Sequence, residues 1–359
     1  MRILQVINCF QRSGGAEKFV LDLSVALKGI NNDIEVLSLV PPNKDNNDFI
    51  DILKKHRIKF HCLQGTNIRS INVIQNLGTF FKSNHYDIVH CHLFPALYYC
   101  ALYRHNIPKL FYTEHSTDNK RRHIKIFRVI DSYFYNKYDR IFCISDQTEK
   151  NLISYIPNLK TTIINNGINI HEFQNANKIE KSALIKGGEN YTLIVMVARF
   201  IKSKDHITLF NALKFLPENV HIICLGNGEL EEKRRQYCID NNLQNRVHFL
   251  GLRKDVKNIL KTADVIVLST EYEGFSISML EAMASGTPFI ASNVPGVKDL
   301  ISGYTELFPF GDSEKLASII CHILSDNDYR DNIVKKNLEF ATQYDINSVA
   351  MKYYTFYTL

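Results

Sequence analysis

The sequence contains no apolar run near the ~18 residues that a membrane-spanning helix needs. Its opening residues, Met1–Asn8, are too few for a signal-peptide core, lack a small-residue cleavage site, and read as a buried strand. The eight cysteines form no CxxC pair and lie mostly in apolar stretches, which favours small buried residues over a disulfide framework or a zinc site. These absences predict a protein of the reducing cytoplasm.

Low-complexity segments are absent, and the only internal repetition is a twofold alternation of strands and helices. A chain of 359 residues is long for one core and sufficient for two domains. The hydrophobic content of 45% and charged content of 22% are typical of a soluble globular protein. We therefore expect two ordinary folded domains.

Acidic residues are scarce in the first half of the chain. Residues 1–170 hold 22 Lys and Arg against 14 Asp and Glu, a net charge of +8, whereas the remaining residues sum to −2. The densest basic run is Lys120–Arg128, in which bases and apolar residues interleave. This pattern is typical of an amphipathic basic helix that faces anionic lipid or phosphate, which would bring the protein to the inner face of the cell membrane. A solvated charged face explains the run equally well, so both interpretations stay open.

Both halves of the chain alternate short β-branched runs with helical patterns. The strands expected in the first half are Arg2–Ile7, Ile34–Leu39, Asp87–Cys91, Leu110–Glu114 and Arg140–Ile144. Those expected in the second half are Leu193–Ala198, Val220–Leu225, Val247–Leu250, Asp264–Leu268 and Pro288–Ala291. The alternation predicts an α/β protein of two doubly wound, Rossmann-like domains with parallel sheets. Ligands of such sheets bind at the carboxyl ends of strands, so a cleft between the domains is the expected site.

The domain boundary is expected near Asn166 and Gly167, a turn dipeptide that precedes a polar stretch. We predict an N-terminal domain over residues 1–165, a linker over 166–189 and a C-terminal domain over 190–340. After Asp312 the chain is expected to be helical. The last predicted helix, within 341–359, is rich in aromatic residues, which suggests docking on another surface such as the first domain.

Two basic residues follow the first strand of the second half. Arg199 lies at the carboxyl end of that strand, and Lys204 lies near the next helix start. A guanidinium grips two phosphate oxygens as a fork, and an ammonium adds a mobile point charge. Together they can stabilise a departing diphosphate, so we expect no metal or other cofactor. Alone this pair is weak support, because a strand-end Arg and a first-turn Lys are common on surfaces.

Two carboxylates, Glu273 and Glu281, stand eight positions apart across a loop-to-helix junction. Gly274 permits close backbone approach, and the amides around Phe275–Ser278 are expected to form an anion site at the helix start. Eight residues of helix would separate the carboxylates by ~12 Å, whereas glycosidases need roughly 5–9.5 Å. The pair therefore suits two parts of one ligand, since each carboxylate can accept two hydrogen bonds from a sugar diol. With the two bases described above, the predicted ligand is a nucleotide-sugar.

Together these motifs resemble the retaining family 4 glycosyltransferases of the GT-B fold, over nearly the whole chain. The Arg-x4-Lys of Arg199 and Lys204 precedes a Glu-x7-Glu that has Gly and Phe after its first Glu. Further resemblances keep the family's order along the chain: the glycine-rich loop Gly14–Glu17, the strand ends at His92, His115 and Ser145, the interdomain stretch Asn165–Ile168, and the loop Gly226–Glu229.

The resemblance implies a role for each matching residue. Arg199 and Lys204 would hold the donor diphosphate, Glu281 the ribose hydroxyls and Glu273 the hydroxyls of the transferred sugar. His115 would lie beside that sugar, so the expected catalytic residues are His115, Glu273, Arg199 and Lys204. Further donor contacts are expected from Gly228, Gly274, Phe275 and Ser276. Contacts to phosphate or acceptor are expected from Gly14 and Gly15.

The resemblance further implies transfer of a hexose from a nucleotide-diphosphate donor to a hydroxyl of a glycan or lipid-linked glycan in cell-surface polysaccharide biosynthesis. In this family the leaving phosphate is thought to help deprotonate the acceptor on the same face. Electrostatic stabilisation of that phosphate would then be the main contribution of the protein. Two other hypotheses stay open, a nucleotide-sugar 2-epimerase of similar fold and a non-catalytic subunit that binds a nucleotide-sugar. No nucleic-acid partner is expected.

Three features depart from this pattern or compete with it. The family often has Gly-Gly where this chain has Val294–Val297, in a loop expected to line the donor site. Asp326 and Asp328 spell the DxD metal–diphosphate motif of another transferase fold, but we expect a helix cap there. His90 alternates with His92 on a buried strand and is expected to be a core residue with satisfied hydrogen bonds.

Overall fold

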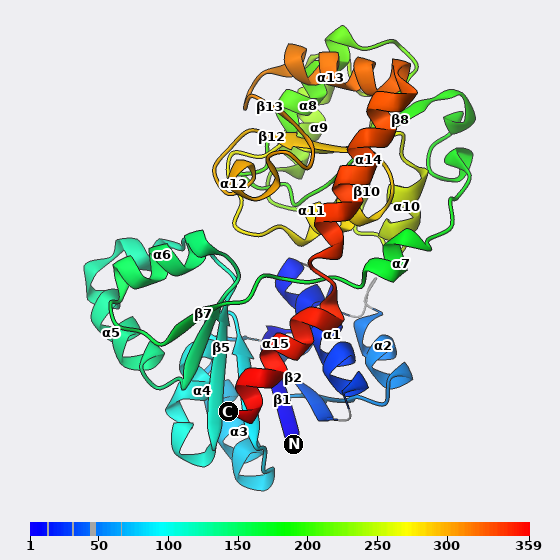
Figure 1. Cartoon of the computed structure of the whole chain (residues 1–359). Helices are drawn as coiled ribbons and strands as arrows, with labels where there is room; N and C mark the ends of the chain where they lie inside the picture. Colours follow the sequence, from blue (N-terminus) through cyan, green and yellow to red (C-terminus); the bar gives the residue numbers. More distant parts are fainter. Residues whose placement is uncertain (13, 31, 44–47, 66) are drawn as a thin grey trace. The chain divides into compact units, whose positions relative to one another are not determined.

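The structure is a computed structural model that describes every residue except 13, 31, 44–47 and 66. It divides into two compact units (Figure 1). Unit 1 contains Met1–Gly167 together with the C-terminal segment Ile346–Leu359, and unit 2 contains Ile168–Asp345. Each unit has its own parallel sheet, which confirms the predicted fold class of two doubly wound, Rossmann-like domains.

Unit 1 is built on a seven-stranded sheet with the order β3-β2-β1-β4-β5-β6-β7, in which all neighbouring strands are parallel. The order reverses between β1 and β4, and the loops that follow the strands at such a reversal form the ligand site of doubly wound sheets. The strands are β1 (Arg2–Cys9), β2 (Asp33–Val40), β3 (Lys59–Cys62), β4 (Ile88–His92), β5 (Lys109–Glu114), β6 (Arg140–Cys143) and β7 (Thr161–Ile163).

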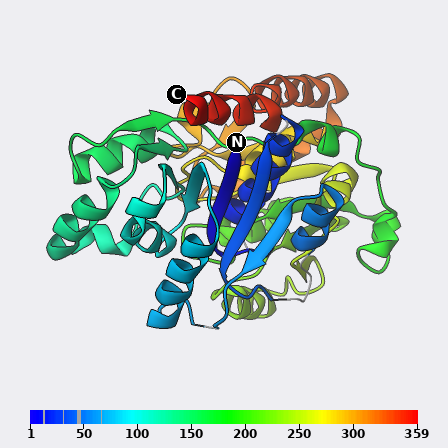
Figure 2. The ribbon, with the colours of Figure 1, turned by 90° about the horizontal axis from the view of Figure 1, so that it is seen from below.

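Helices cover both faces of this sheet (Figure 2). They are α1 (Gly15–Gly29), α2 (Phe49–Lys55), α3 (Ile71–Ser83), α4 (Ala96–Leu102), α5 (Lys125–Tyr135), α6 (Asp146–Tyr155) and α15 (Ile346–Thr358), with short 3-10 turns η1 (Arg104–Asn106) and η2 (Lys120–His123). Helix α15 lies beside α1, and Tyr353 of α15 meets the ring of Phe19 with 6.0 Å between centroids. The aromatic C-terminal helix is therefore part of the core of unit 1.

Unit 2 is built on a six-stranded parallel sheet with the order β10-β9-β8-β11-β12-β13, which reverses between β8 and β11. Its strands are β8 (Thr192–Val197), β9 (Val220–Leu225), β10 (Val247–Gly251), β11 (Val265–Leu268), β12 (Phe289–Ser292) and β13 (Glu306–Phe308). Its helices are α7 (Ile170–Gln174), α8 (His206–Ala212), α9 (Glu231–Asp240), α10 (Val256–Thr262), α11 (Ile277–Ala284), α12 (Lys298–Ile301), α13 (Ser313–Ser325) and α14 (Asn327–Thr342), with 3-10 turns η3 (Lys181–Ala183), η4 (Gly188–Asn190) and η5 (Leu213–Phe215).

All ten strands expected from the sequence are present, with ends that differ by at most two residues. Central strands such as β9 are buried along their whole length, which is why they read as continuous apolar runs. Strands β3, β7 and β13 are not predicted by the sequence pattern. Each is a short strand at the edge of its sheet and is only partly buried, so it lacks the apolar pattern.

The linker was expected over 166–189, and its residues 168–189 are a packed part of unit 2. This segment contains α7, η3 and η4, and hydrogen bonds and an ion pair tie it to α10. The backbone NH of Ile179 donates to Thr262 Oγ1 at 2.9 Å, and Lys257 Nζ lies 2.7 Å from Glu172 Oε1. The polar composition of this segment therefore reflects surface hydrogen bonding to unit 2 and not an independent connection.

Candidate functional site

Arg199 follows β8 in unit 2, at the reversal of strand order. The chain after β8 lies against a glycine loop, because the NH of Phe200 donates to the Asn227 carbonyl at 3.0 Å and the NH of Leu230 donates to the Phe200 carbonyl at 2.9 Å. Gly228 has a φ of +158°, and a Cβ there would lie 2.5 Å from the Phe200 carbonyl oxygen, so only glycine permits this approach. The loop fixes the backbone of Arg199, whose side chain is exposed and accessible to a ligand.

Lys204 and Glu273 form an ion pair in which the ammonium Nζ donates to carboxylate Oε1. Both side chains are only 13% exposed. Burial, and after it the charge of Arg199, lowers the pKa of the Lys204 amine to about 7. Contact with the Glu273 carboxylate acts in the opposite direction, because it favours the charged ammonium. Two cations and one carboxylate thus share this part of unit 2, and an anionic ligand would relieve the repulsion between the cations.

The loop after β12 packs against the backbone of Glu273. A Cβ added to Gly296, whose φ is +81°, would lie 1.9 Å from the Glu273 carbonyl oxygen. The NH of Gly296 donates to Asp299 Oδ2 at 3.3 Å. The segment Val294–Val297, expected to line the donor site, therefore meets Glu273 directly and requires glycine at position 296.

Helix α11, which carries Glu281, begins at Ile277. Ser276 caps it by accepting a hydrogen bond from the NH of Met279 at 3.4 Å. Glu273 lies in the preceding loop, so the rise of ~1.5 Å per residue applies only to positions 277–281. The separation expected for eight residues of helix therefore does not describe the two carboxylates. Glu281 is buried on the second turn of the helix.

Phe275, expected to contact the donor, is buried against another aromatic ring of unit 2. Its ring meets that of Tyr344 edge-on, with 4.9 Å between centroids. The Phe275 side chain therefore belongs to the core, and a ligand contact at this position would fall to the backbone, beside partly exposed Gly274 and Ser276. The donor-binding role of these three residues stays a prediction.

Gly14 and Gly15 begin helix α1, directly after the β1 end of the strand-order reversal in unit 1. Gly14 is the N-cap residue with extended backbone, and a Cβ there would lie 2.9 Å from Glu17 Oε2. Amides at a helix start attract anions, and Glu17 in the first turn is an internal anion near them. The expected contact with phosphate or acceptor stays a prediction.

His115, which follows β5 in unit 1, belongs to a hydrogen-bonded row that contains the buried side chains of His92 and Gln5. Its Nε2 lies 3.0 Å from Nδ1 of His92, and Nε2 of His92 lies 2.8 Å from Oε1 of Gln5. Burial lowers the pKa of His115 to about 3 and holds that of His92 well below its usual value. Both imidazoles are therefore neutral near pH 7.

His90 lies next to this hydrogen-bonded row. It is a core residue, and both of its ring nitrogens are hydrogen-bonded, as predicted. Its Nδ1 lies 2.5 Å from the Tyr357 hydroxyl, and its Nε2 lies 2.8 Å from Thr113 Oγ1. The Tyr353 hydroxyl also reaches Thr113, at 3.3 Å. The two tyrosines of α15 thus anchor that helix to the sheet of unit 1.

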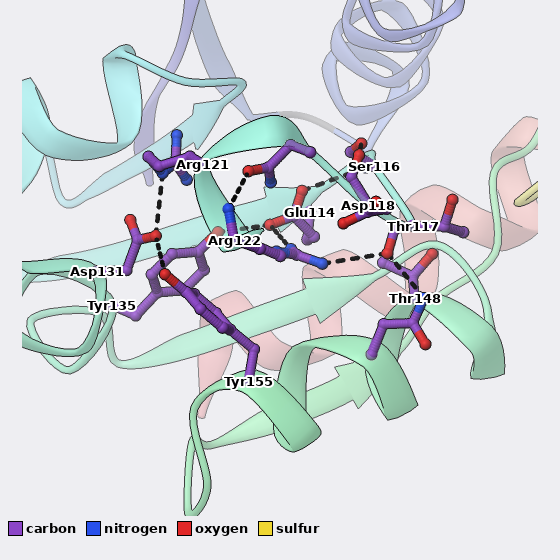
Figure 3. A network of polar contacts seen from close by, with 12 residues as sticks. Glu114, Ser116, Thr117, Asp118, Arg121, Arg122, Asp131, Tyr135, Thr148 and Tyr155 are labelled. Carbon is purple, nitrogen blue, oxygen red and sulfur yellow. Dashed lines mark hydrogen bonds and ion pairs between the residues drawn. The ribbon is translucent and has the colours of Figure 1, made fainter. Parts of the chain in front are cut away.

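The basic run Lys120–Arg128 does not form one amphipathic helix, which corrects the sequence reading. The 3-10 turn η2 ends at His123, Ile124 has extended backbone, and α5 begins at Lys125. Figure 3 shows Arg121 and Arg122 within an internal polar network. Arg121 Nε donates to Asp131 Oδ2 at 3.0 Å, and an NH2 of Arg122 donates to Glu114 Oε2 at 2.8 Å. The Tyr155 and Tyr135 hydroxyls donate to the same two carboxylates. The charges of both arginines are therefore neutralised internally.

The outer side of α5 is apolar. Its four exposed apolar residues, here called the apolar face of α5, have exposed fractions of 66%, 71%, 37% and 60% for Ile126, Val129, Ile130 and Tyr133. Their spacing of three and four positions puts them on one side of the helix. Lys125 and Arg128 are exposed on the same helix. Exposed apolar residues on one side of a helix, beside two bases, make this face a candidate interaction site.

A cavity of about 280 Å³ lies at the carboxyl ends of β4 and β5 in unit 1. It is lined by aromatic, amide, hydroxyl and charged groups: Leu93, Phe94, Tyr112, Glu114, Ser116, Asn119 and Arg121. The charges of Glu114 and Arg121 are balanced by Arg122 and Asp131. A lining with polar groups, aromatic rings and little net charge suits an uncharged polyhydroxylated ligand better than an anion.

Within the described residues, no group of three or more His, Cys, Asp or Glu side chains is arranged to hold a metal ion. Asp326 of the DxD sequence is a helix cap, as predicted, since it accepts from the NH of Tyr329 at 2.9 Å. All eight cysteines are free, although Cys62 and Cys321 are exposed, unlike the buried cysteines expected. In the part of the chain that the structure describes, none of the helices has the length and apolar character needed to cross a bilayer.

Gln5 and Gly296 are not among the site residues that the sequence predicts. Gln5 is the one polar residue inside the apolar run of β1, and such an interruption is a signal of a buried hydrogen bond. Gly296 follows Pro295, and a Pro-Gly dipeptide signals a turn with positive φ at the glycine. Gln5 contacts His92 and Gly296 contacts the Glu273 backbone, both from other parts of the sequence, so only the fold identifies these contacts.

Two family models match the chain, one for each unit. The model described as Glycosyltransferase Family 4 matches residues 13–172, and the model described as Glycosyl transferases group 1 matches residues 176–340. Together they extend over most of the chain.

Two curated enzymes illustrate the similarity in sequence. The chain is 28% identical over 296 residues to UDP-Gal:alpha-D-GlcNAc-diphosphoundecaprenol alpha-1,3-galactosyltransferase of Escherichia coli, covering 77% of this chain and 76% of that enzyme. It is 29% identical over 169 residues to N,N'-diacetylbacillosaminyl-diphospho-undecaprenol alpha-1,3-N-acetylgalactosaminyltransferase of Campylobacter jejuni, covering 46% of this chain and 44% of that enzyme.

Solved structures resemble the chain over its whole length. Anabaena HepE in complex with UDP and glucose has a TM-score of 0.84 at 21% identity, with 100% of both chains covered. A glycosyltransferase from Rickettsia africae has a TM-score of 0.79 at 21% identity, with 99% of this chain and 97% of that chain covered. At these identities the similarity establishes the fold alone.

Proposed function

The chain belongs to the family 4 glycosyltransferases, retaining enzymes of the GT-B fold, and on that premise we propose that it transfers a sugar from a nucleoside-diphosphate donor to a hydroxyl of a lipid-linked glycan. The observation that carries this proposal is the cluster of Arg199, Lys204 and Glu273 after β8 and β11. A diphosphate neutralises the two cations, and a sugar diol satisfies the carboxylate. A nucleotide-sugar offers both groups at once.

In this assignment Arg199 and Lys204 hold the diphosphate, Glu273 accepts hydrogen bonds from the transferred sugar, and Glu281 accepts them from the ribose. The backbone at Gly228 and at the start of α11 supplies the remaining donor contacts. Two comparisons support a nucleotide-sugar: HepE has been crystallised with UDP and glucose, and the E. coli relative is named for a UDP-galactose donor.

The chemistry follows from where charge develops. Transfer breaks the bond between the anomeric carbon and the phosphate oxygen and forms one from that carbon to the acceptor oxygen on the same face. The leaving diphosphate takes up the electron pair and the acceptor proton, while Arg199 and Lys204 stabilise its charge. His115 keeps the role implied by the resemblance, a neutral imidazole beside the transferred sugar. Because side chains supply this stabilisation, we propose that activity persists in chelator.

We assign the acceptor sugar to the cavity that Glu114, Ser116 and Asn119 help to line in unit 1. Its exposed Phe94 ring can pack on sugar carbons, and its polar groups can bond to hydroxyls. Both curated relatives described above are named for sugars linked to diphospho-undecaprenol, which supports a lipid-linked saccharide as the acceptor class.

A lipid-linked acceptor calls for contact with a membrane, and we propose that the apolar face of α5 makes it. This face would lie at the level of the headgroups, with Lys125 and Arg128 near anionic lipid. Arg121 and Arg122, which the sequence suggested for this contact, are engaged in internal ion pairs. The proposed contact thus moves from the basic run as a whole to one helix.

Thermal denaturation with a panel of nucleotide-sugars tests the donor assignment. A ligand at a hundred times its Kd stabilises a protein by about 2.7 kcal/mol, so the correct donor should raise the Tm of the wild type. It should not stabilise Lys204→Met, whereas Lys214→Met, at an exposed lysine of unit 2, should respond as the wild type does. The absence of stabilisation by any nucleoside diphosphate or nucleotide-sugar would contradict the proposal.

A further inference from the structure

Three polar side chains from or next to neighbouring strands of the unit 1 sheet form one hydrogen-bonded row, Gln5–His92–His115. Gln5 lies within β1, His92 ends β4, and His115 follows β5. The contacts are 2.8 Å from Gln5 Oε1 to His92 Nε2 and 3.0 Å from His92 Nδ1 to His115 Nε2. Gln5 and His92 are fully buried, so the contact between them is shielded from water.

The direction of hydrogen-bond donation along this row follows from counting the protons on the two imidazoles. A neutral imidazole carries one N–H, and both imidazoles are neutral because burial disfavours their charged forms. An amide oxygen only accepts, so the proton of His92 lies on Nε2. Nδ1 of His92 is then an acceptor, and His115 must donate to it from Nε2. Nδ1 of His115 is left without a proton.

Within the residues that the structure describes, the only hydrogen bond of the His115 ring is the one to His92, so no described donor bonds to that Nδ1 atom. The ring is half-buried, and the edge of Phe19 contacts it with 5.7 Å between centroids. His115 therefore offers a ligand one polar ring atom. The position of its ring proton is determined by Gln5, which acts through His92.

We infer that Gln5 is a positioning residue, which through His92 holds His115 in the Nε2-protonated tautomer and so presents a bare Nδ1 as hydrogen-bond acceptor to a sugar hydroxyl. The identity of the ligand rests on the proposed function, whereas the tautomer does not. A bare nitrogen selects for a hydroxyl that can donate and against a phosphate oxygen, which can only accept. His115 thus binds a sugar hydroxyl, and the diphosphate is bound by the cations of unit 2.

Gln5 also has a feature that stability alone does not explain. Its Nε2 is buried and forms no hydrogen bond of ordinary geometry within the described part of the chain, although the Gln5 side chain interacts with the Tyr357 hydroxyl. An unpaired buried amide group is unfavourable compared with an apolar residue of the same shape. A glutamine at this point is therefore consistent with a requirement for its acceptor oxygen beside His92.

The tautomer can be measured directly by long-range ¹⁵N–¹H correlation spectra of histidine-labelled protein. We expect a protonated Nε2 and a bare Nδ1 for His115 in the wild type. Gln5→Met keeps the volume but removes the acceptor, so both tautomers of His115 should be populated. Its turnover should fall about tenfold, as expected when one hydrogen bond is misaligned.

Thr113→Val is the matched control. It breaks the neighbouring contacts of His90 and Tyr353 in the same buried layer and leaves the contacts among Gln5, His92 and His115 in place. It should keep the tautomer of the wild type. A proton on Nδ1 of His115 in the wild type, or an unchanged tautomer in Gln5→Met, would overturn the inference. Since the spectra need no substrate, they stay informative even if the transferase assay fails and the proposed function falls.

Discussion

The ammonium group of Lys204 contacts the carboxylate of Glu273 in unit 2, although 69 positions of sequence separate them. With Arg199 close enough to lower the pKa of Lys204, the pair links the proposed phosphate-binding group to the proposed sugar-binding group. The two proposed binding groups therefore belong to one ion-paired unit. This linkage gives rise to pH and mutational effects that a pair of independent surface charges would not show.

Affinity for a nucleoside diphosphate should fall as pH rises through neutrality. Burial and Arg199 lower the pKa of Lys204 to about 7, so the amine loses its proton and its charge over this range. Diphosphate binds the charged form, so calorimetry should find tighter binding at pH 6 than at pH 8. Lys204→Arg stays charged throughout and should show a smaller change. Because titration of the phosphate itself is common to both proteins, equal pH dependence in the two would exclude this role of Lys204.

Glu273 and Glu281 should affect different parts of the donor. Glu281→Ala should weaken binding of both the free nucleoside diphosphate and the nucleotide-sugar by roughly tenfold or more, as expected for hydrogen bonds to a charged group. Glu273→Gln should weaken only the nucleotide-sugar. Calorimetry with the two ligands measures each effect. The reverse pattern would exchange the two assignments.

Gly296 should be required for placing Glu273 and not merely for its backbone conformation. Gly296 and Gly311 have φ values of +81° and +82°, but a Cβ meets the Glu273 carbonyl only at position 296 and nothing within 4 Å at position 311. Gly311→Ala should cost about 1–2 kcal/mol of stability from left-handed strain alone. Gly296→Ala should cost more and should also weaken nucleotide-sugar binding. If both variants bind the nucleotide-sugar like the wild type, the contact does not position Glu273.

The apolar face of α5 should bind anionic vesicles. Burial of a branched side chain contributes roughly 1.5–3 kcal/mol, so Ile126→Ser with Val129→Ser should weaken sedimentation with phosphatidylglycerol vesicles about tenfold or more. Ile71→Ser is a matched control, since Ile71 is 67% exposed on α3 and Ile126 is 66% exposed. Vesicle binding that survives the double variant, or a dimer that the variant dissociates, would assign this face to another partner.

The sequence predicted the parts of the molecule that have a local pattern. Strands buried on both faces, such as β9, carry continuous apolar runs, and the glutamates and bases of unit 2 lie at recognisable spacings. Edge strands such as β3 lack that pattern because they are half-exposed. Motif spacing therefore identified the candidate residues of the donor site but not the start of α11 at Ile277, which the three residues after Glu273 decide.

Contacts between distant residues could not be predicted from the sequence. The basic run Lys120–Arg128 reads as a lipid-facing surface until the fold brings Asp131 to Arg121 and Glu114 to Arg122. In the same way Gln5 reads as an isolated polar residue until β1 and β4 become neighbours and His92 reaches it. The charge of a segment is visible in the sequence, but the partner that neutralises it is a property of the fold.

The most direct test of the proposed function is transfer itself. The protein is incubated with the nucleotide-sugar that stabilises it most and with a lipid-linked saccharide, and the product is identified by mass and by the NMR coupling of its anomeric proton. We predict one added sugar with the anomeric configuration of the donor, and release of one nucleoside diphosphate per sugar. An epimerised free nucleotide-sugar, or donor binding without turnover in the presence of acceptor, would contradict it.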